Sequence, residues 1–121
     1  MKKHILIVDD EAVILELLGS YLRNSGYRVT TASSADMAEE IAARDKPCLV
    51  ITDLQLEDSD GLEMVARLKS RLPDTPMMLL TGVLFDSKVV RENLAKKVEC
   101  YIEKTAPLTH ILEEVRRIVG K

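Results

Sequence analysis

The stretch ILIVDD at residues 5–10 decides the fold. Its first four residues are all apolar, which is typical of a strand buried on both faces of a parallel sheet. Two aspartates, Asp9 and Asp10, follow this run directly, and the stretch LVITD at residues 49–53 repeats the arrangement with Asp53 at its end. Buried strands that end in acidic residues predict a sheet with a polar site along one edge.

Short apolar runs alternate with segments of helical periodicity along the chain. The runs predict strands at residues 5–8, 27–31, 49–52, 77–80 and 100–103. The periodic segments predict helices at residues 14–22, 33–43, 62–72, 86–98 and 107–119. Ser33 is expected to begin the second helix, with Asp36 as its partner in a capping box. Strands that alternate with helices predict an α/β fold, a five-stranded parallel sheet with helices on both faces.

The composition indicates one globular domain and argues against two classes of function. A chain of 121 residues fits a single domain, and its content of 46% hydrophobic and 31% charged residues is ordinary. The net charge of -3 argues against a concentrated basic patch, so direct nucleic-acid binding is not expected. No apolar run approaches the ~20 residues that cross a bilayer, so no membrane function is expected either.

The cysteines and the N-terminus indicate the compartment. Cys48 and Cys100 each precede an apolar run, and two buried free thiols are a better interpretation than a disulfide in such a chain. The apolar run at residues 5–8 is too short for the core of a signal peptide and meets aspartates at once. We therefore expect a cytoplasmic protein.

Four charged side chains follow the predicted strands at the same end. Asp9, Asp10 and Asp53 follow the first and third strands, and Lys104 follows the fifth. Each has an ordinary explanation alone: helix capping for the aspartate pair, a solvated loop for Asp53 and a surface position for Lys104. Three carboxylates at one edge repel one another, however, and a hard cation such as Mg²⁺ removes that penalty. Together the four residues predict a site for a divalent cation and a phosphoryl group.

Two further residues lie in or after the predicted strands. Thr81 follows the fourth strand and offers a hydroxyl donor, and Gly82 beside it leaves space for a bound group. Tyr101 lies in the fifth strand. Their ordinary explanations are a strand-end threonine and a half-buried strand residue, and the sequence alone leaves both alternatives open.

In this order, the residues resemble the receiver domain of two-component response regulators, in a form similar to the chemotaxis regulators. The resemblance covers the whole chain, and the family's motif residues match Asp9, Asp10, Asp53, Thr81, Tyr101 and Lys104. It implies a flavodoxin-like, doubly wound sheet with strand order 2-1-3-4-5. It also implies that residues 1–121 form a single receiver domain of a bacterial signalling system, with no output domain present.

The resemblance implies a phosphorelay function. Asp53 is the implied nucleophile and modified residue, which takes a phosphoryl group from the phosphohistidine of a sensor histidine kinase or a phosphotransfer protein. Mg²⁺ is the implied cofactor, held by Asp10, Asp53 and the main-chain carbonyl of Gln55, with Asp9 acting mainly through water. Lys104 offsets charge on the transferring oxygens. The domain catalyses its own phosphorylation and dephosphorylation, and it is a signalling switch, not a conventional enzyme.

The same resemblance implies how phosphorylation changes the surface. Thr81 bonds the phosphoryl group and moves toward it, and Tyr101 turns inward. The changed surface controls a downstream protein or a fused output domain. The resemblance is also consistent with dimerisation on phosphorylation. Hydrolysis of the acyl phosphate resets the switch.

The chain departs from the family's pattern beside the site. Leu56 and Glu57 stand where Met-Pro is common, so the loop loses a proline and gains a negative charge. Thr105 stands where a proline, often after a cis bond, normally follows the family's lysine. Because a cis bond before a non-proline residue costs about 2.5–4 kcal/mol, we predict a trans Lys104–Thr105 bond.

Two other classes of protein compete with the signalling switch. A degenerate receiver that only binds proteins is disfavoured by the retained acids and Lys104, although Glu57 and Thr105 leave room for it. A flavodoxin-like cofactor enzyme would need a Gly-rich phosphate loop and more aromatic surface, and the sequence has neither. An EF-hand is excluded, because counting back from Gly61 puts Leu56 at its first ligand position.

Overall fold

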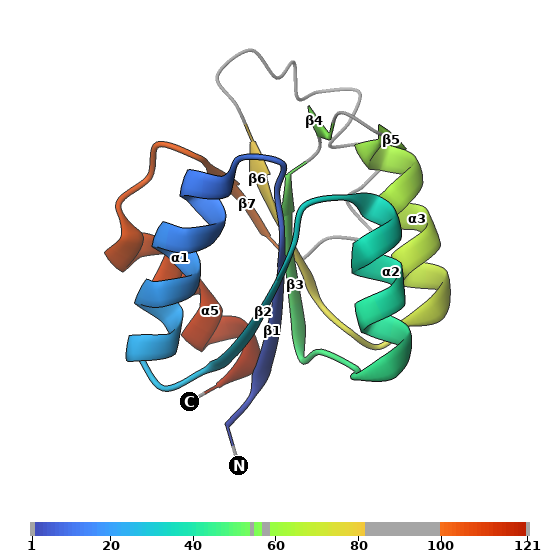
Figure 1. Cartoon of the computed structure of the whole chain (residues 1–121). Helices are drawn as coiled ribbons and strands as arrows, with labels where there is room; N and C mark the ends of the chain where they lie inside the picture. The colour runs from blue at the N-terminus through green and yellow to red at the C-terminus, as the bar shows by residue number, and fades with distance from the viewer. Residues whose placement is uncertain (1, 54, 57–58, 82–99, 121) are drawn as a thin grey trace.

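A five-stranded parallel sheet runs through the centre of the computed structural model, which describes residues 2–53, 55–56, 59–81 and 100–120 (Figure 1). Its strands are β1 (His4–Val8), β2 (Arg28–Ala32), β3 (Leu49–Asp53), β6 (Met77–Thr81) and β7 (Cys100–Glu103). All neighbours pair in parallel, in the order β2-β1-β3-β6-β7. Counting the five sheet strands along the chain, this is the doubly wound order 2-1-3-4-5, so the predicted fold is confirmed.

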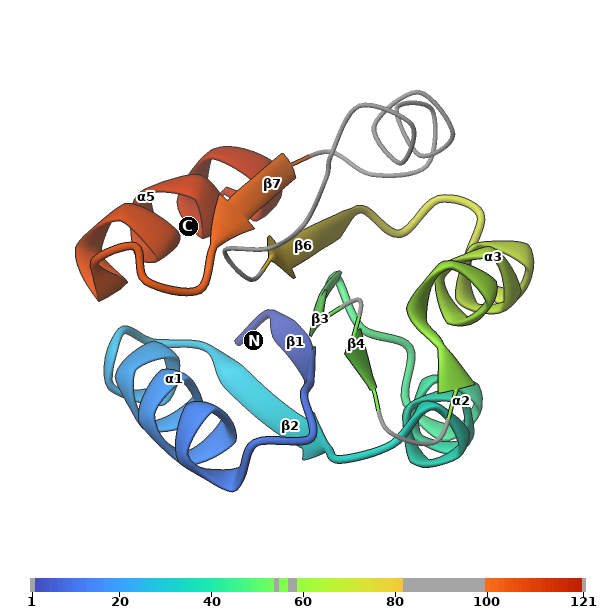
Figure 2. The ribbon, with the colours of Figure 1, turned by 90° about the horizontal axis from the view of Figure 1, so that it is seen from above.

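The described helices cover both faces of the sheet. They are α1 (Ala12–Asn24), α2 (Ala35–Arg44), α3 (Gly61–Arg71) and α5 (Leu108–Val119). Seen from above, α1 and α5 lie on one face, and α2 and α3 lie on the other (Figure 2). The predicted helix at residues 86–98 lies outside the described residues. In the part of the chain that the structure describes, no helix has the length and apolar character needed to cross a membrane.

Alternate residues of the central strands form two cores, one on each face of the sheet. Toward α2 and α3 the buried strand side chains are Leu6, Val8, Val50, Met77 and Leu79. Toward α1 and α5 they are Ile5, Ile7, Leu49, Ile51, Met78 and Leu80. Both faces need apolar side chains, which explains why these strands are continuous apolar runs in the sequence. A central strand of this kind has room for charged groups only where it ends.

The N-cap of helix α2 lies one residue later than predicted. Its N-cap is Ser34, whose hydroxyl oxygen accepts a hydrogen bond from the Met37 N–H at 3.1 Å. Ser33 and Ser34 are adjacent, and residue preference cannot separate two neighbouring caps of the same type. The residue three positions after the cap is therefore Met37, so the predicted capping box with Asp36 is wrong. Asp36 instead lies in the first turn, where its charge favours the helix dipole.

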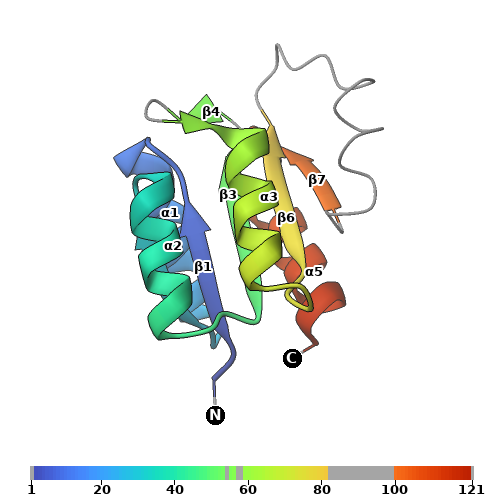
Figure 3. The ribbon, with the colours of Figure 1, turned by 90° about the vertical axis from the view of Figure 1, so that its right-hand side faces the viewer.

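A short hairpin follows β3, in a stretch where the sequence predicted no strand. Its strands are β4 (Gln55–Leu56) and β5 (Ser59–Asp60), paired antiparallel with Gln55 opposite Asp60. Figure 3 shows β4 near the end of the sheet at which β3 finishes. Strands of two residues are too short to show an alternation of apolar and polar side chains, so no periodicity indicates them.

The prediction of two buried thiols is wrong for one cysteine. Both cysteines are free, and Cys100 is buried, but Cys48 is exposed. Cys48 lies immediately before β3, which begins at Leu49. Its neighbours Pro47 and Leu49 are both buried, so Cys48 is a single exposed residue between two buried ones, and a neighbouring apolar run does not determine its burial.

Gly19 lies inside α1 and is a site where the helix can be stabilised. A Cβ atom there would lie 3.6 Å from Thr31 Cγ2 and 3.8 Å from Val29 Cγ1, which are ordinary contact distances. Because alanine favours a helix interior over glycine, we expect Gly19→Ala to raise the free energy of unfolding by about 0.5–1 kcal/mol. Urea denaturation followed by circular dichroism measures the change.

Gly26→Ala is the matched control for this substitution. Gly26 has a φ of +104°, which residues with a side chain rarely adopt. The same replacement there is expected to lower the free energy of unfolding by about 1–2 kcal/mol. A loss of stability in Gly19→Ala as well would mean that α1 and β2 pack more closely than the structure places them.

Candidate functional site

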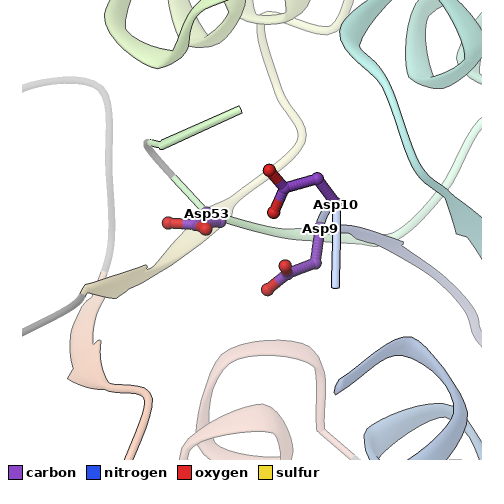
Figure 4. Close-up of side chains that lie close together, drawn as sticks. All are labelled: Asp9, Asp10 and Asp53. Carbon is purple, nitrogen blue, oxygen red and sulfur yellow. The ribbon is translucent and has the colours of Figure 1, made fainter. Parts of the chain in front are cut away.

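An acidic site forms at the edge of the sheet where the parallel strands end. Asp9 follows β1 directly, Asp10 comes next, and Asp53 is the last residue of β3. One carboxylate oxygen from each lies within 4.8 Å of the others, and Figure 4 shows the three side chains close together. Both chain termini lie at the opposite end of the sheet (Figure 1). A group of three such oxygens can hold a metal ion.

Asp9 and Asp53 are almost completely buried. Their exposed fractions are 0% and 3%, while Asp10 is more exposed. The Asp9 Oδ1 atom accepts a hydrogen bond from the Glu11 N–H at 2.9 Å. The main-chain N–H of Asp9 donates to the Ala32 carbonyl oxygen at 3.0 Å. Main-chain bonds on both sides of the β1 end therefore fix this carboxylate.

Lys104 brings a positive charge to the carboxylates from the last strand of the sheet. It follows β7 directly, and its side chain is 16% exposed. The Nζ atom lies 2.8 Å from Asp53 Oδ2, 3.0 Å from Glu11 Oε1 and 3.1 Å from Asp9 Oδ2. An ammonium group has three N–H donors, and three carboxylates surround this one; its hydrogen bond to Asp9 goes to the Oδ1 atom, at 3.4 Å.

The stem of Lys104 lines a small apolar cavity between α1 and α5. The cavity has a volume of about 100 Å³ and is also lined by Ile14, Leu17, Leu18, Leu80, Ala106, Leu108 and Ile111. Methylene groups against apolar side chains, with the charged head at a polar group, are the usual surroundings of a partly buried lysine. The apolar cavity at one end and the carboxylates at the other thus fix the direction in which the Lys104 side chain extends.

The electrostatics of the site favour an additional cation. Burial raises the pKa of Asp9 above its ordinary value, and the hydrogen bonds from the Glu11 N–H and Lys104 offset only part of that effect. Burial alone would lower the pKa of Lys104, but its bonds to Asp53, Glu11 and Asp9 raise it, so the ammonium stays charged. Among the described residues of this site, the Lys104 ammonium contacts three carboxylates, and the carboxylate of Asp10 lies beside two of them and adds a fourth negative charge. This excess of negative charge on oxygen ligands fits a hard divalent cation.

Two of the other predicted site residues lie at or near this edge, and the third lies within a strand. Thr81 ends β6 opposite Glu103 of β7, and Gln55 begins the hairpin strand β4. Tyr101 lies in β7, packs against the core on the α2 and α3 face, and has a buried hydroxyl group. Glu57 lies outside the described residues.

The chain turns directly after Lys104 without a proline. No peptide bond among the described residues is cis, so the predicted trans bond between Lys104 and Thr105 is confirmed. The Ala106 N–H donates to the Glu103 carbonyl oxygen at 2.9 Å and closes the turn. A main-chain hydrogen bond therefore shapes the segment that carries the lysine.

Glu11 also belongs to the site, although no motif in the sequence indicated it. It is the N-cap residue of α1, yet its side chain makes no capping hydrogen bond. Its Oε1 atom contacts Lys104 instead. The available indication was a mismatch: a glutamate stands at a helix start, where Ser, Thr, Asp or Asn is preferred.

The fold and the site together define a class of protein: a doubly wound α/β domain with carboxylates and a lysine gathered at the carboxyl end of its sheet. The response regulator receiver domain family matches residues 5–116, a segment that contains all of these side chains. This chain belongs to the response regulator receiver domain family. It is a receiver domain of phosphorelay signal transduction, and therefore a signalling switch and not a conventional enzyme.

Individual proteins show the same similarity. The response regulator protein VraR of Staphylococcus aureus is 33% identical over 115 residues, which cover 93% of this chain and 54% of that protein. The alkaline phosphatase synthesis transcriptional regulatory protein PhoP of Bacillus subtilis is 41% identical over 82 residues, which cover 68% of this chain and 34% of that protein. The chain thus spans about a third to a half of these two relatives. A CheY-like receiver domain protein of Methanospirillum hungatei superposes with a TM-score of 0.89 at 26% identity, covering 97% of this chain and 93% of that chain.

Asp9→Asn tests the unfavourable burial of a charge at this edge. Because the folded-state pKa of Asp9 is raised, the wild type loses stability as the pH rises through that pKa. Asparagine has no charge to bury, so Asp9→Asn should have the higher free energy of unfolding at pH 7 without divalent cations. The difference should disappear below the ordinary aspartate pKa of about 3.9.

Urea denaturation at both pH values measures this difference. Asp74→Asn, at an exposed position, is the matched control and should change stability little at either pH. If Asp9→Asn is instead the less stable protein at pH 7, Lys104 compensates fully for the buried charge.

Proposed function

We propose that Asp53 accepts a phosphoryl group from a phosphohistidine and that the resulting change of surface controls a partner. The observation that carries this proposal is the position of the Asp53 carboxylate. It is almost buried, lies 2.8 Å from the Lys104 ammonium and shares a possible metal-binding group with Asp9 and Asp10. Phosphoryl transfer needs such a fixed nucleophile beside cationic groups that offset charge on the phosphoryl oxygens.

In the proposed reaction, a carboxylate oxygen of Asp53 forms a bond to phosphorus while the phosphorus–nitrogen bond of the donor breaks. The electron pair of that bond remains with the donor imidazole, which leaves as histidine. Lys104 holds its ammonium group where negative charge spreads over the phosphoryl oxygens in the transition state. Water later hydrolyses the acyl phosphate, which releases phosphate and regenerates the carboxylate.

Mg²⁺ is the proposed cofactor of this site. Asp10, Asp53 and the main-chain carbonyl of Gln55 would hold the ion, and Asp9 would act mainly through water. When bound, the ion offsets negative charge on the phosphoryl oxygens. The donor set supports this assignment, because carboxylate and carbonyl oxygens are hard ligands and the three carboxylates already lie close together.

Thr81 and Tyr101 are the proposed switch residues. The sheet register supports a connection between them, because Asp53 pairs with Leu80, next to Thr81, and Leu79 pairs with Tyr101. A Thr81 that moves toward the phosphoryl group therefore moves a strand that lies against Tyr101. In this proposal, the altered surface controls a downstream protein or a fused output domain. Dimerisation on phosphorylation is part of the same proposal.

The proposed partners and location follow from this chemistry. The phosphoryl donor is assigned to a sensor histidine kinase or a phosphotransfer protein. Transcriptional regulatory proteins longer than the matched segment are among the relatives, which supports an output in gene control. The free thiols of Cys48 and Cys100 support a cytoplasmic location. Residues 1–121 are assigned to a single receiver domain.

Incubation with acetyl phosphate and Mg²⁺ tests Asp53 as the phosphoacceptor. We expect intact-mass spectrometry to show the addition of one phosphoryl group to the wild type and none to Asp53→Asn. Asp36→Asn, on the outer surface of α2, is the matched control and should be phosphorylated like the wild type. Phosphorylation that persists in Asp53→Asn would identify a different acceptor, and an unmodified wild type would indicate a protein-binding module without phosphoryl transfer.

Thermal or urea unfolding with added Mg²⁺ tests the metal site. A ligand that binds only the folded protein, present at ten times its Kd, stabilises that protein by about 1.4 kcal/mol. We expect this gain in the wild type and its loss on addition of EDTA. Asp10→Asn should remove most of the gain, and Asp10 suits the test because it is the most exposed carboxylate of the three. An equal gain in Asp10→Asn would place the bound ion elsewhere.

A further inference from the structure

We propose that Glu11 is a positioning residue that holds, on Lys104, the hydrogen-bond donor that a phosphoryl oxygen takes during phosphorylation. This inference rests on the proposed role of Asp53 as the phosphoacceptor. Lys104 has three N–H donors, and its Nζ atom lies 2.8 Å from Asp53, 3.0 Å from Glu11 and 3.1 Å from Asp9. A phosphoryl oxygen can bond this ammonium only when one of the three carboxylates releases its donor.

The burial of the three carboxylates decides which of them gives up its contact with Lys104. Asp9 is 0% exposed, and a buried carboxylate that loses its partner keeps the full desolvation penalty. Asp53 carries the phosphoryl group itself and cannot move away from it. The Glu11 side chain is 58% exposed, so water can replace the ammonium at little cost. Glu11 is therefore the exchangeable partner of Lys104.

The start of α1 gives an independent reason for this role. Glu11 is the N-cap residue and has an extended main chain, but its side chain makes no capping hydrogen bond. Local helix stability favours Ser, Thr, Asp or Asn at this position, so it does not explain the glutamate. The contact with Lys104 does explain it. The Glu11 N–H is bonded to the Asp9 carboxylate at 2.9 Å, which fixes the main chain beside the site and leaves the side chain free to turn.

The exchange of Glu11 for a phosphoryl oxygen on Lys104 predicts the sign of a change in binding affinity that can be measured. Before phosphorylation, Glu11 helps to hold the ammonium over the site. During phosphorylation, the same carboxylate competes with the phosphoryl oxygen for one N–H donor. Removal of the carboxylate should therefore strengthen the binding of a phosphoryl group and should do so only through Lys104.

Beryllofluoride in the presence of Mg²⁺ is the probe, because it mimics a phosphoryl group on a carboxylate without being hydrolysed. From the strength of exposed ion pairs, we expect Glu11→Ala to bind beryllofluoride with a Kd about two- to fivefold lower than that of the wild type. The variant loses no helix cap, since the Glu11 side chain makes none. Glu16→Ala removes the same charge from an exposed position further along α1 and is the matched control, with an affinity close to that of the wild type.

Two further measurements separate this role from a structural one. In a Lys104→Ala background, removal of the Glu11 carboxylate should leave the beryllofluoride affinity unchanged, because the group for which the two ligands compete is gone. In the protein that retains Lys104, the increase in beryllofluoride affinity caused by Glu11→Ala should become smaller as NaCl is added. Salt screens the exposed ion pair between Glu11 and Lys104.

The outcomes distinguish this inference from the proposed function beneath it. A wild type that does not bind beryllofluoride with Mg²⁺ overturns both. A wild type that binds, with Glu11→Ala binding equally or more weakly, overturns only the role of Glu11. An equal gain in Glu16→Ala also overturns that role, because the effect would then come from net charge and not from Lys104.

Discussion

The ion pair between Lys104 and Asp53, with its atoms 2.8 Å apart, joins the last strand of the sheet to its central strand. Strand β6 lies between β3 and β7, so the lysine reaches across the end of β6, where Thr81 stands. A second contact of the same ammonium, with Asp9, adds the end of β1. One side chain therefore connects the ends of three strands, and the geometry of the edge depends on it.

This connection leaves the site with more negative than positive charge. Burial raises the pKa of Asp9, which shows that the folded protein holds this carboxylate at a cost. Buried groups with perturbed pKa values cluster at functional sites, so the cluster is better explained by function than by folding. A divalent cation or a rearrangement of the lysine contacts relieves the same imbalance, and the proposed phosphoryl transfer uses both.

The sheet and most of the site could be predicted because one physical cause determines them. Burial on both faces requires continuous apolar runs, as at residues 5–8, and parallel strands bring their carboxyl ends to one edge. Features outside that cause were missed. The paired strands β4 and β5 are too short for any periodicity, and Cys48 is exposed although its neighbours Pro47 and Leu49 are buried.

Glu11 was missed for a different reason. Its contact with Lys104 joins residues 93 positions apart in the chain, and no local pattern indicates the reach of a side chain over that separation. Only the absence of a good helix cap could have drawn attention to it. A local preference that is broken without a structural gain is a useful indication of a functional residue.

The chemistry and the proposed switch share one short strand. Strand β7 spans Cys100–Glu103, contains Tyr101 and leads directly to Lys104. Its carboxyl end is held by the contacts of the ammonium group, and its side chain at Tyr101 packs against the core on the α2 and α3 face. A phosphoryl group that takes a donor from Lys104 changes the contacts at one end of this strand, while Thr81, opposite Glu103, lies beside the same end. In the proposed function, the lysine therefore acts both in the transfer and in carrying its effect to Tyr101, because each exchange of its partners also changes the contacts that hold β7.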